Sequence, residues 1–147
     1  MKLVDFLPDF LNDIIAIEEQ SFLHPWKEKM FLDSAANELV SFKVIVENEK
    51  VAGYCLFWIL EGQAEILNIA VSPDFRRRSF AKQMLQYIIE CSKEKDTECV
   101  FLDVRAGNSA AISLYESFGF EKTGIRKKYY TGISGKEDAL ILRKKLK

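Results

Sequence analysis

Histidine is nearly absent from this chain of 147 residues, which has one, and cysteine is scarce, with three. Cys55, Cys91 and Cys99 stand singly in apolar surroundings, which predicts buried reduced thiols and excludes a C-x-x-C redox pair. Because both residue types are few and poorly spaced, no metal site is expected. A cysteine nucleophile would have to use His24, so chemistry of the Cys-His kind is disfavoured.

Long apolar runs and a strong charge imbalance are also lacking. No apolar stretch is long enough to span a membrane and the N-terminus has no signal-peptide pattern, so we expect a cytoplasmic protein. The formal net charge is −1 at pH 7, which argues against general nucleic-acid binding. Without repeats, low-complexity tracts or linkers, residues 1–147 are expected to form one domain.

Apolar periodicity alternates between helix and strand along the chain, which predicts a mixed α/β fold. The expected helices are Asp9–Phe22, Lys27–Asn37, Phe80–Lys95 and Ser109–Phe118. The expected strands are one near Leu3, followed by Phe42–Val46, Val51–Leu60, Ala64–Val71, Val100–Val104, Phe120–Tyr130 and Glu137–Leu146.

A basic loop connects the strand Ala64–Val71 to the helix that begins at Phe80. Pro73 and Asp74 end the strand, and the segment Arg76–Ser79 precedes the helix. The first amide N–H groups of a helix have no intrahelical partner and its dipole is positive there, so a phosphate group would be stabilised. The arginines add forked donors suited to phosphate oxygens. An ordinary solvated basic turn before a surface helix is the alternative.

A second strand–helix connection follows about twenty residues later. Val100–Val104 is typical of a short buried strand, interrupted by Asp103, and an isolated buried carboxylate is costly unless it is paired or functional. Gly107–Ser109 offers a turn and an N-cap, and Gly119 ends the helix. Tyr115 lies on the apolar face of that helix, where it is either a core tyrosine or a proton donor.

Six segments spread over nearly the whole chain share one resemblance. They are His24–Phe31, Asn68–Val71, Arg76–Lys82, Asp103–Asn108, Leu114–Phe120, and Tyr129–Tyr130 with Gly135–Ala139. They resemble the GNAT superfamily of acetyl-CoA-dependent N-acetyltransferases, and within it the RimI-type bacterial enzymes. The resemblance implies the GNAT fold, a mixed and mostly antiparallel seven-stranded sheet that is splayed in the middle and flanked by about four helices.

The resemblance also implies acetyl-CoA as cosubstrate and direct attack by an amine in a ternary complex. It implies that the backbone of the splayed strand binds the pantetheine arm, at Ile69, Ala70 and Val71. It implies that loop amides hold the pyrophosphate, at Arg77, Arg78, Ser79, Phe80, Ala81 and Lys82. Asn108 would contact the cofactor from the next helix, Tyr115 would protonate the departing thiolate, and Asp103 would act as general base.

Two positions depart from the family pattern. Ser79 stands where the family has a glycine that lets the backbone approach the phosphate, so weaker acetyl-CoA binding is expected. Asp103 stands where the family has glutamate, which withdraws the carboxylate by roughly 1.5 Å unless a water bridges the gap. The resemblance also offers an alternative base, Glu65, on the strand where other branches of the superfamily place a catalytic glutamate; it shares a strand face with Leu67 and Ile69. The third possibility is that no side chain acts as a dedicated base.

For the acetyl acceptor, the resemblance implies the free α-amine of an N-terminal alanine in a small-subunit ribosomal protein. Trp26 and its neighbours, with Tyr129 and Tyr130, would wall the peptide site. Neither a nucleic acid nor a membrane is expected as a partner. The alternatives are transfer to a lysine side chain or a small amine, or a catalytically weak sensor that binds acyl-CoA.

Overall fold

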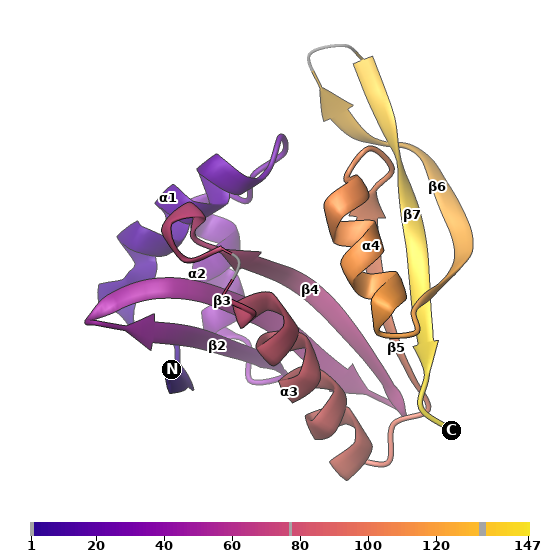
Figure 1. Cartoon of the computed structure of the whole chain (residues 1–147), viewed down its shortest axis with the longest axis horizontal. Coiled ribbons are helices and arrows are strands. Elements are labelled where there is room, and N and C mark those ends of the chain that lie inside the picture. Colours follow the sequence, from indigo (N-terminus) through magenta and orange to yellow (C-terminus); the bar gives the residue numbers. More distant parts are fainter. Residues whose placement is uncertain (1, 77, 133–134) are drawn as a thin grey trace. The chain divides into compact units, whose positions relative to one another are not determined.

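The structure is a computed structural model that describes the backbone of residues 2–76, 78–132 and 135–147. The side chains are described for the same residues except 2, 128–132, 135 and 136. Its helices are α1 (Leu11–Ser21), α2 (Glu28–Ala36), α3 (Phe80–Glu94) and α4 (Ser109–Ser117) (Figure 1). Its strands are β1 (Lys2–Asp5), β2 (Val40–Glu47), β3 (Lys50–Leu60), β4 (Gln63–Val71), β5 (Cys99–Arg105), β6 (Glu121–Gly132) and β7 (Gly135–Lys145).

The strands form one sheet in the order β1-β2-β3-β4-β5-β7-β6. The pairs β1–β2, β2–β3, β5–β7 and β6–β7 are antiparallel, whereas β4 and β5 are parallel. The register of β4 with β5 covers Gln63–Ile66 and Cys99–Leu102, and both strands continue beyond it. The expected mixed, mostly antiparallel seven-stranded sheet with four helices is thereby confirmed.

The chain packs as two compact units. The first consists of Met1–Trp58 and Leu67–Ile88, and the second of Ile59–Ile66 and Ile89–Lys147. Strand β4 and helix α3 each contribute residues to both units. The expectation of a single domain over residues 1–147 stays a prediction.

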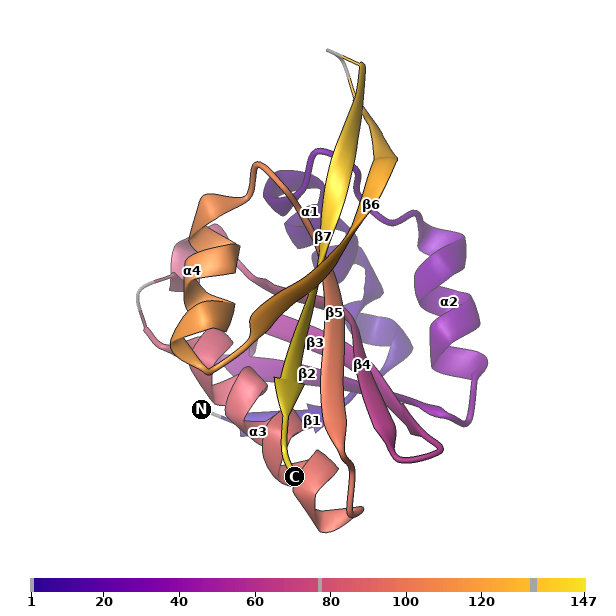
Figure 2. The same ribbon diagram turned by 90° about the vertical axis from the view of Figure 1, so that its right-hand side faces the viewer.

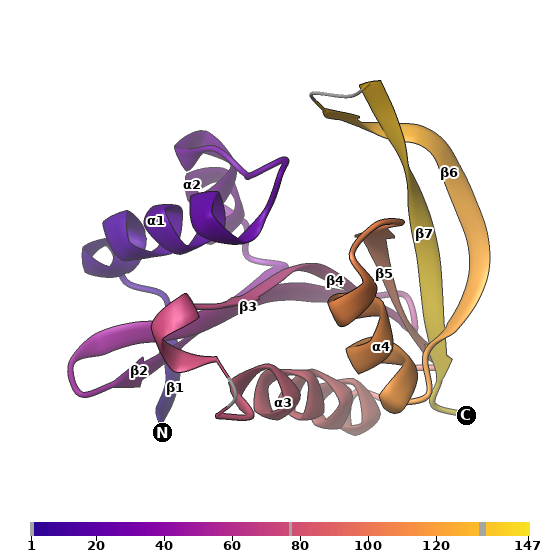
Figure 3. The same ribbon diagram turned by 45° about the horizontal axis from the view of Figure 1, so that its top comes forward.

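In the first unit, helices cover both faces of the β2–β3 pair (Figures 1 and 3). From α1 and α2, Ile14 and Phe31 pack against a cluster that includes Tyr54 of β3. On the other face, the ring of Tyr87 in α3 lies 6.2 Å from that of Phe57. Alternate residues of the strands therefore meet different helices, as the period of two in a strand requires.

In the second unit, α4 lies beside β5 and β7 (Figures 1 and 2). Alternate residues of β5 are buried, which matches the apolar pattern of the sequence. The ammonium group of Lys144 donates to the carbonyl of Phe118 at 2.7 Å. Gly119, at φ +90°, ends the helix in the left-handed conformation that favours glycine.

Two short 3-10 turns are absent from the sequence-based expectation. One covers Pro8–Phe10, so α1 begins at Leu11 rather than at Asp9. The other covers Pro73–Phe75, in the loop before α3. In both, proline sets φ and lacks an N–H group, which suits the first position of a helical turn. Among the described residues, no helix has the combination of length and apolar character needed to cross a membrane.

Candidate functional site

The loop between β4 and α3 is shaped by the turn Pro73–Phe75. The N–H group of Ser72 donates to the carbonyl of Ala52 at 2.8 Å, which ties the end of β4 to β3. Phe75 and Phe80 are both buried, and their ring centroids lie 6.1 Å apart. The loop is therefore anchored at its two ends by apolar side chains, and Arg76, Arg78 and Ser79 between them are exposed.

Ser79 is the N-cap residue of α3, because its carbonyl accepts the first helical hydrogen bond, from Gln83 at 3.0 Å. Its φ of +64° lies in the left-handed region that residues with a Cβ rarely adopt. The amides that follow, of Phe80, Ala81 and Lys82, are those that an α-helix leaves without an intrahelical acceptor. An anion at this position would meet these donors and the positive end of the helix dipole.

The side chain of Arg78 contacts other residues of the protein. Its guanidinium lies 3.2 Å from the carboxylate of Glu47 in β2, and it lies over the rings of Phe75 and Phe80 at 5.8 and 5.6 Å. With about half of the side chain exposed, the ion pair with Glu47 is a surface one. The Arg78 guanidinium thus braces the loop through Glu47 and the two phenylalanine rings.

Strand β4 comes close to β3 beside Ala70. A Cβ added at Gly53 would lie 2.8 Å from the carbonyl oxygen of Ala70 and 3.2 Å from the end of the Met84 side chain. Any larger residue at position 53 would therefore displace the strand at Ala70. The absence of a side chain at Gly53 fixes the position of this part of β4.

The side chains of β4 alternate regularly between buried and half-buried positions up to the end of the strand. Asn68 and Ala70 are buried, and the side-chain amide of Asn68 donates to Glu18 of α1. The register of β4 with β5 ends at Ile66. The backbone of residues 69–71 therefore lies beyond this register, which suits a ligand that binds the strand through its backbone.

A buried polar cluster surrounds Glu18 next to Asn68. Glu18 is 1% exposed, and its carboxylate accepts three hydrogen bonds. Oε2 accepts from the main-chain N–H of Trp26 at 2.9 Å, and Oε1 accepts from the hydroxyl of Tyr54 at 2.6 Å and the amide of Asn68 at 2.9 Å. Burial, followed by the charge of Glu18, raises the pKa of Tyr54 far above its ordinary value, so the hydroxyl remains a donor.

In the second unit, Asp103 is paired. Its carboxylate lies 3.3 Å from Nε of Arg126 in β6. The parallel register sets Glu65 opposite Phe101, two residues before Asp103, so both candidate bases lie on one face of the β4–β5 pair. The geometry of this face does not favour one carboxylate over the other as a base.

Tyr115 is 6% exposed, on the buried side of α4. Its ring meets that of Phe120 edge to face, with centroids 5.7 Å apart. Its carbonyl accepts from the N–H groups of Phe118 and Phe120 at 3.0 and 3.1 Å, which fixes the end of the helix. The aromatic ring is therefore held in one place by packing, as a positioned proton donor requires.

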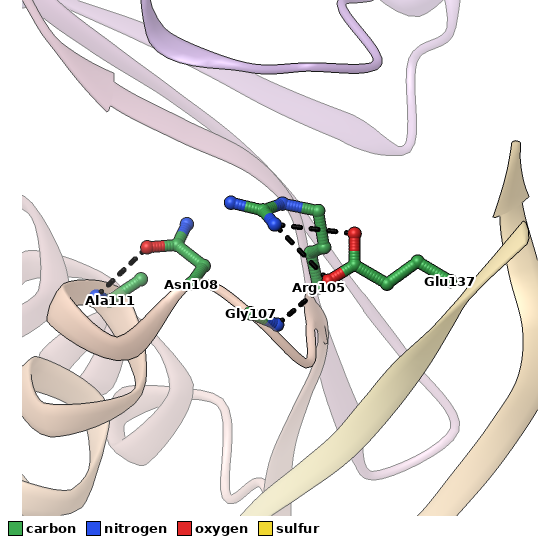
Figure 4. A network of polar contacts seen from close by, with 5 residues as sticks. All are labelled: Arg105, Gly107, Asn108, Ala111 and Glu137. Atoms are coloured by element: carbon green, nitrogen blue, oxygen red, sulfur yellow. Dashed lines mark hydrogen bonds and ion pairs between the residues drawn. The ribbon is translucent and has the colours of Figure 1, made fainter. Parts of the chain in front are cut away.

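The turn between β5 and α4 is held by a carboxylate from β7 (Figure 4). Oε2 of Glu137 accepts from the N–H of Gly107 at 2.9 Å, and both carboxylate oxygens lie within 3.2 Å of the Arg105 guanidinium. Asn108 caps α4, because its carboxamide oxygen accepts from the N–H of Ala111 at 3.2 Å. Its carboxamide nitrogen is turned away from the helix and is the group that could donate to a ligand (Figure 4).

The residues implied by the resemblance divide between the two units. Ile69, Ala70, Val71, the α3 loop and the start of α3 belong to the first, and Asp103, Asn108 and Tyr115 to the second. Arg77 lies outside the described residues, as do the side chains of Tyr129 and Tyr130. The catalytic and cofactor-binding assignments stay predictions.

Sequence reasoning missed Glu18, Tyr54 and Arg126, and it named Glu137 without a role. A signal for Glu18 was present, since it follows Ile14 by one helical turn and so shares the apolar face of α1. A carboxylate at such a position needs buried donors. Those donors come from distant parts of the chain, which a local pattern does not reveal.

Comparison with known proteins completes the description of the site. The model of the Acetyltransferase (GNAT) family matches residues 11–120. The chain is 35% identical over 126 residues to the ribosomal protein bS18-alanine N-acetyltransferase of Escherichia coli (strain K12), covering 86% of this chain and 84% of that protein. It is 38% identical over 133 residues to a putative ribosomal protein bS18-alanine N-acetyltransferase of Bacillus subtilis (strain 168), covering 90% of this chain and 87% of that protein.

A solved structure gives the same result for the fold. The crystal structure of the ribosomal-protein-S18-alanine N-acetyltransferase from Escherichia coli matches with a TM-score of 0.89 at 31% identity. The match covers 99% of this chain and 93% of that chain.

Proposed function

The chain belongs to the GNAT family of acetyltransferases, and we propose that it transfers acetyl from acetyl-CoA to the N-terminal alanine of ribosomal protein bS18. The observation that carries this proposal is the identity of 35 and 38% to two proteins of that name, over at least 86% of this chain. A ribosomal protein as acceptor agrees with the cytoplasmic location that we also propose.

We assign the cofactor's phosphates to the loop before α3. The N-terminal amides of α3 and the exposed Ser79 cap suit a phosphate group, and the backbone of residues 69–71, beyond the end of the β4–β5 register, suits a pantetheine arm. Asn108 would add one amide donor from the start of α4. When bound, acetyl-CoA supplies the thioester carbonyl that the amine attacks.

The proposed proton transfers use one residue at each step. Tyr115 would give its phenolic proton to the thiolate that departs from the acetyl group. Asp103 would take a proton from the incoming ammonium, directly or through water, with Glu65 as the alternative. Because an α-amine has a pKa near 8, about a tenth of it is neutral near pH 7, far more than of a lysine side chain, so its deprotonation is the less demanding of the two.

The first test is turnover of acetyl-CoA on three peptides, followed by thiol release and mass spectrometry. One peptide has a free N-terminal alanine, one has the same sequence with a blocked N-terminus and an internal lysine, and one has a free N-terminal methionine. Acetylation of the free alanine peptide alone is the expected result. Transfer only to lysine would contradict the proposal, and acyl-CoA binding without turnover would favour the sensor.

The acid is tested by Tyr115→Phe, which removes one hydroxyl. We expect kcat to fall by about a hundredfold or more, because general acid catalysis contributes on that scale. The matched control is Tyr87→Phe, which makes the same change on α3 outside the proposed site. Equal losses of kcat in the two variants, or none in Tyr115→Phe, would remove Tyr115 from the mechanism.

A further inference from the structure

We infer that Glu18 is a positioning residue for acetyl transfer: it fixes the loop from Phe22 to Lys27 and joins that loop to β4 at Asn68. The inference rests on the proposed function, with Ile69–Val71 binding the cofactor, and on the expectation from the family resemblance that Trp26 and its neighbours border the acceptor peptide. All the contacts that carry it lie within the first unit. Glu18 itself touches neither substrate in the proposed mechanism.

Only a carboxylate satisfies the groups that surround position 18. Three donors converge on it, from the main chain of Trp26 and the side chains of Tyr54 and Asn68. A carboxylate accepts at both oxygens, whereas a glutamine accepts at one and donates at the other. Burial of the charge is costly, and an apolar residue would fill the same place beside Ile14 without that cost. The contribution of Glu18 therefore lies in the three hydrogen bonds that link α1 to Trp26, Tyr54 and Asn68.

The loop between α1 and α2 depends on Glu18 at two points. The carbonyl of Glu18 accepts from the N–H of Phe22 at 3.1 Å, where the helix ends, and its side chain accepts from the N–H of Trp26. Between these anchors the loop exposes Leu23, which is 67% accessible. The indole of Trp26 packs 5.2 Å from the ring of Phe31. The first anchor is a main-chain contact that any residue at position 18 would make, so the buried carboxylate supplies the second, at Trp26.

The second arm of the network reaches the cofactor strand. Asn68 donates to Oε1 of Glu18 and is followed directly by Ile69, the first of the three residues assigned to the pantetheine arm. Loss of the carboxylate would therefore release the loop and the strand together. The third arm, Tyr54, leads into β3 and supplies a control, because it contacts the same oxygen without reaching the loop.

The test compares Glu18→Met, Glu18→Gln and Tyr54→Phe with the wild type. Methionine has nearly the length of glutamate but removes every acceptor. Glutamine keeps one oxygen, which can still accept from Trp26. The measurements are KM for the alanine peptide, KM for acetyl-CoA, kcat, the melting temperature, and hydrogen exchange at the amide of Trp26. If Glu18→Met does not fold, Glu18→Gln carries the test alone.

We expect Glu18→Met to raise KM for the peptide by about tenfold or more, the scale of a lost hydrogen bond to a charged group. Glu18→Gln should give a smaller increase, and in both variants the Trp26 amide should exchange faster. Tyr54→Phe should lower the melting temperature while both KM values and the exchange of Trp26 stay at the wild-type level. Such a split separates positioning from general stability.

Unchanged hydrogen exchange at the amide of Trp26 in both Glu18 variants would overturn the inference, whichever substrate accepts the acetyl group. It would equally be overturned if Tyr54→Phe raised KM for the peptide as much as Glu18→Gln does, because the role would then be structural only. Failure of the proposed function is a separate outcome: the wild type would acetylate none of the three peptides. The exchange measurement would then still decide whether Glu18 holds the loop.

Discussion

At the scale of the residue, Ser79 has a backbone conformation that its own side chain disfavours. The N-terminus of α3 requires a left-handed conformation there, at φ +64°, and the family that the chain resembles meets this demand with glycine. Serine carries a Cβ that makes this conformation unfavourable by about 1 kcal/mol. The departure from the family pattern that the sequence indicated thus has a backbone cost as well as a steric one.

Ser79→Gly should therefore stabilise the protein and improve cofactor binding. We expect the free energy of unfolding to rise by about 0.5–1 kcal/mol, since the relief of strain exceeds the entropy that glycine adds to the unfolded chain. The Kd for acetyl-CoA should fall by roughly threefold to tenfold. Urea denaturation and calorimetric titration measure the two effects.

The matched control is Ser117→Gly, at the end of α4, where φ is not positive. In an ordinary helical conformation glycine is less favourable than serine by about 0.5 kcal/mol, so the two substitutions should have opposite signs. A loss of stability in both variants would show that the strain at Ser79 is negligible.

Single-residue roles were also the least accessible to sequence reasoning. The partners of Glu18 lie 36 and 50 residues away in Tyr54 and Asn68, and the partner of Asp103 is Arg126 in another strand. Periodicity reports which face of an element is apolar, but it carries no information on which distant donor reaches a given carboxylate. The pairing of Asp103 satisfies the expectation that a half-buried carboxylate needs a partner, without deciding its role.

At the scale of the element, the sequence is much more informative. Every expected helix and strand is present, because apolar residues recur with clear helical or strand periods and Gly119 stops α4 as expected. The differences are at the boundaries: Pro8–Phe10 forms a separate 3-10 turn, and β6 begins at Glu121 rather than at Phe120. Tight turns depend on a few local hydrogen bonds and leave no periodic pattern.

The connection between β5 and α4 depends on an element much later in the chain, β7. A Cβ added at Gly107 would lie 2.7 Å from both the Arg105 guanidinium and the Glu137 carboxylate, so the turn fits closely around this ion pair. Glu137→Ala should release the turn and, with it, Asn108. We expect KM for acetyl-CoA to rise by about tenfold, with a loss of stability of about 1–3 kcal/mol. Steady-state kinetics and urea denaturation would report both.

Glu121→Ala serves as the control for Glu137→Ala, because it removes the same charge from an exposed position on the neighbouring strand. Its stability should stay within about 0.5 kcal/mol of the wild type. An unchanged KM for acetyl-CoA in Glu137→Ala would mean that Asn108 does not depend on the carboxylate.

At the scale of the whole molecule, the raised pKa of Tyr54 links folding to alkaline pH. Its ordinary pKa is 10.0, so in the unfolded chain the hydroxyl ionises near that pH, whereas in the folded protein burial and Glu18 keep it protonated. Ionisation favours the unfolded state. The stabilisation is therefore complete below about pH 10 and declines above it, by up to about 1.4 kcal/mol per pH unit.

Urea denaturation of the wild type and Tyr54→Phe at about pH 8 and about pH 11 measures this linkage. The wild type should be the more stable protein at the lower pH, by about 1–3 kcal/mol. The difference should shrink at the higher pH, since phenylalanine has no proton to lose. A constant difference across this range would contradict the assigned cause, and lysine deprotonation affects both proteins alike.

The loop that Glu18 holds has one more consequence. Trp26 is one of two tryptophans in the chain, and the other is Trp58 of β3. With its main chain tied to α1 and its indole against Phe31, Trp26 carries an intrinsic fluorophore into the loop assigned to the acceptor peptide. In a Trp58→Phe variant, binding of a peptide should change the fluorescence of Trp26. Stopped-flow fluorescence would then give the rate of binding without a label or a coupled assay.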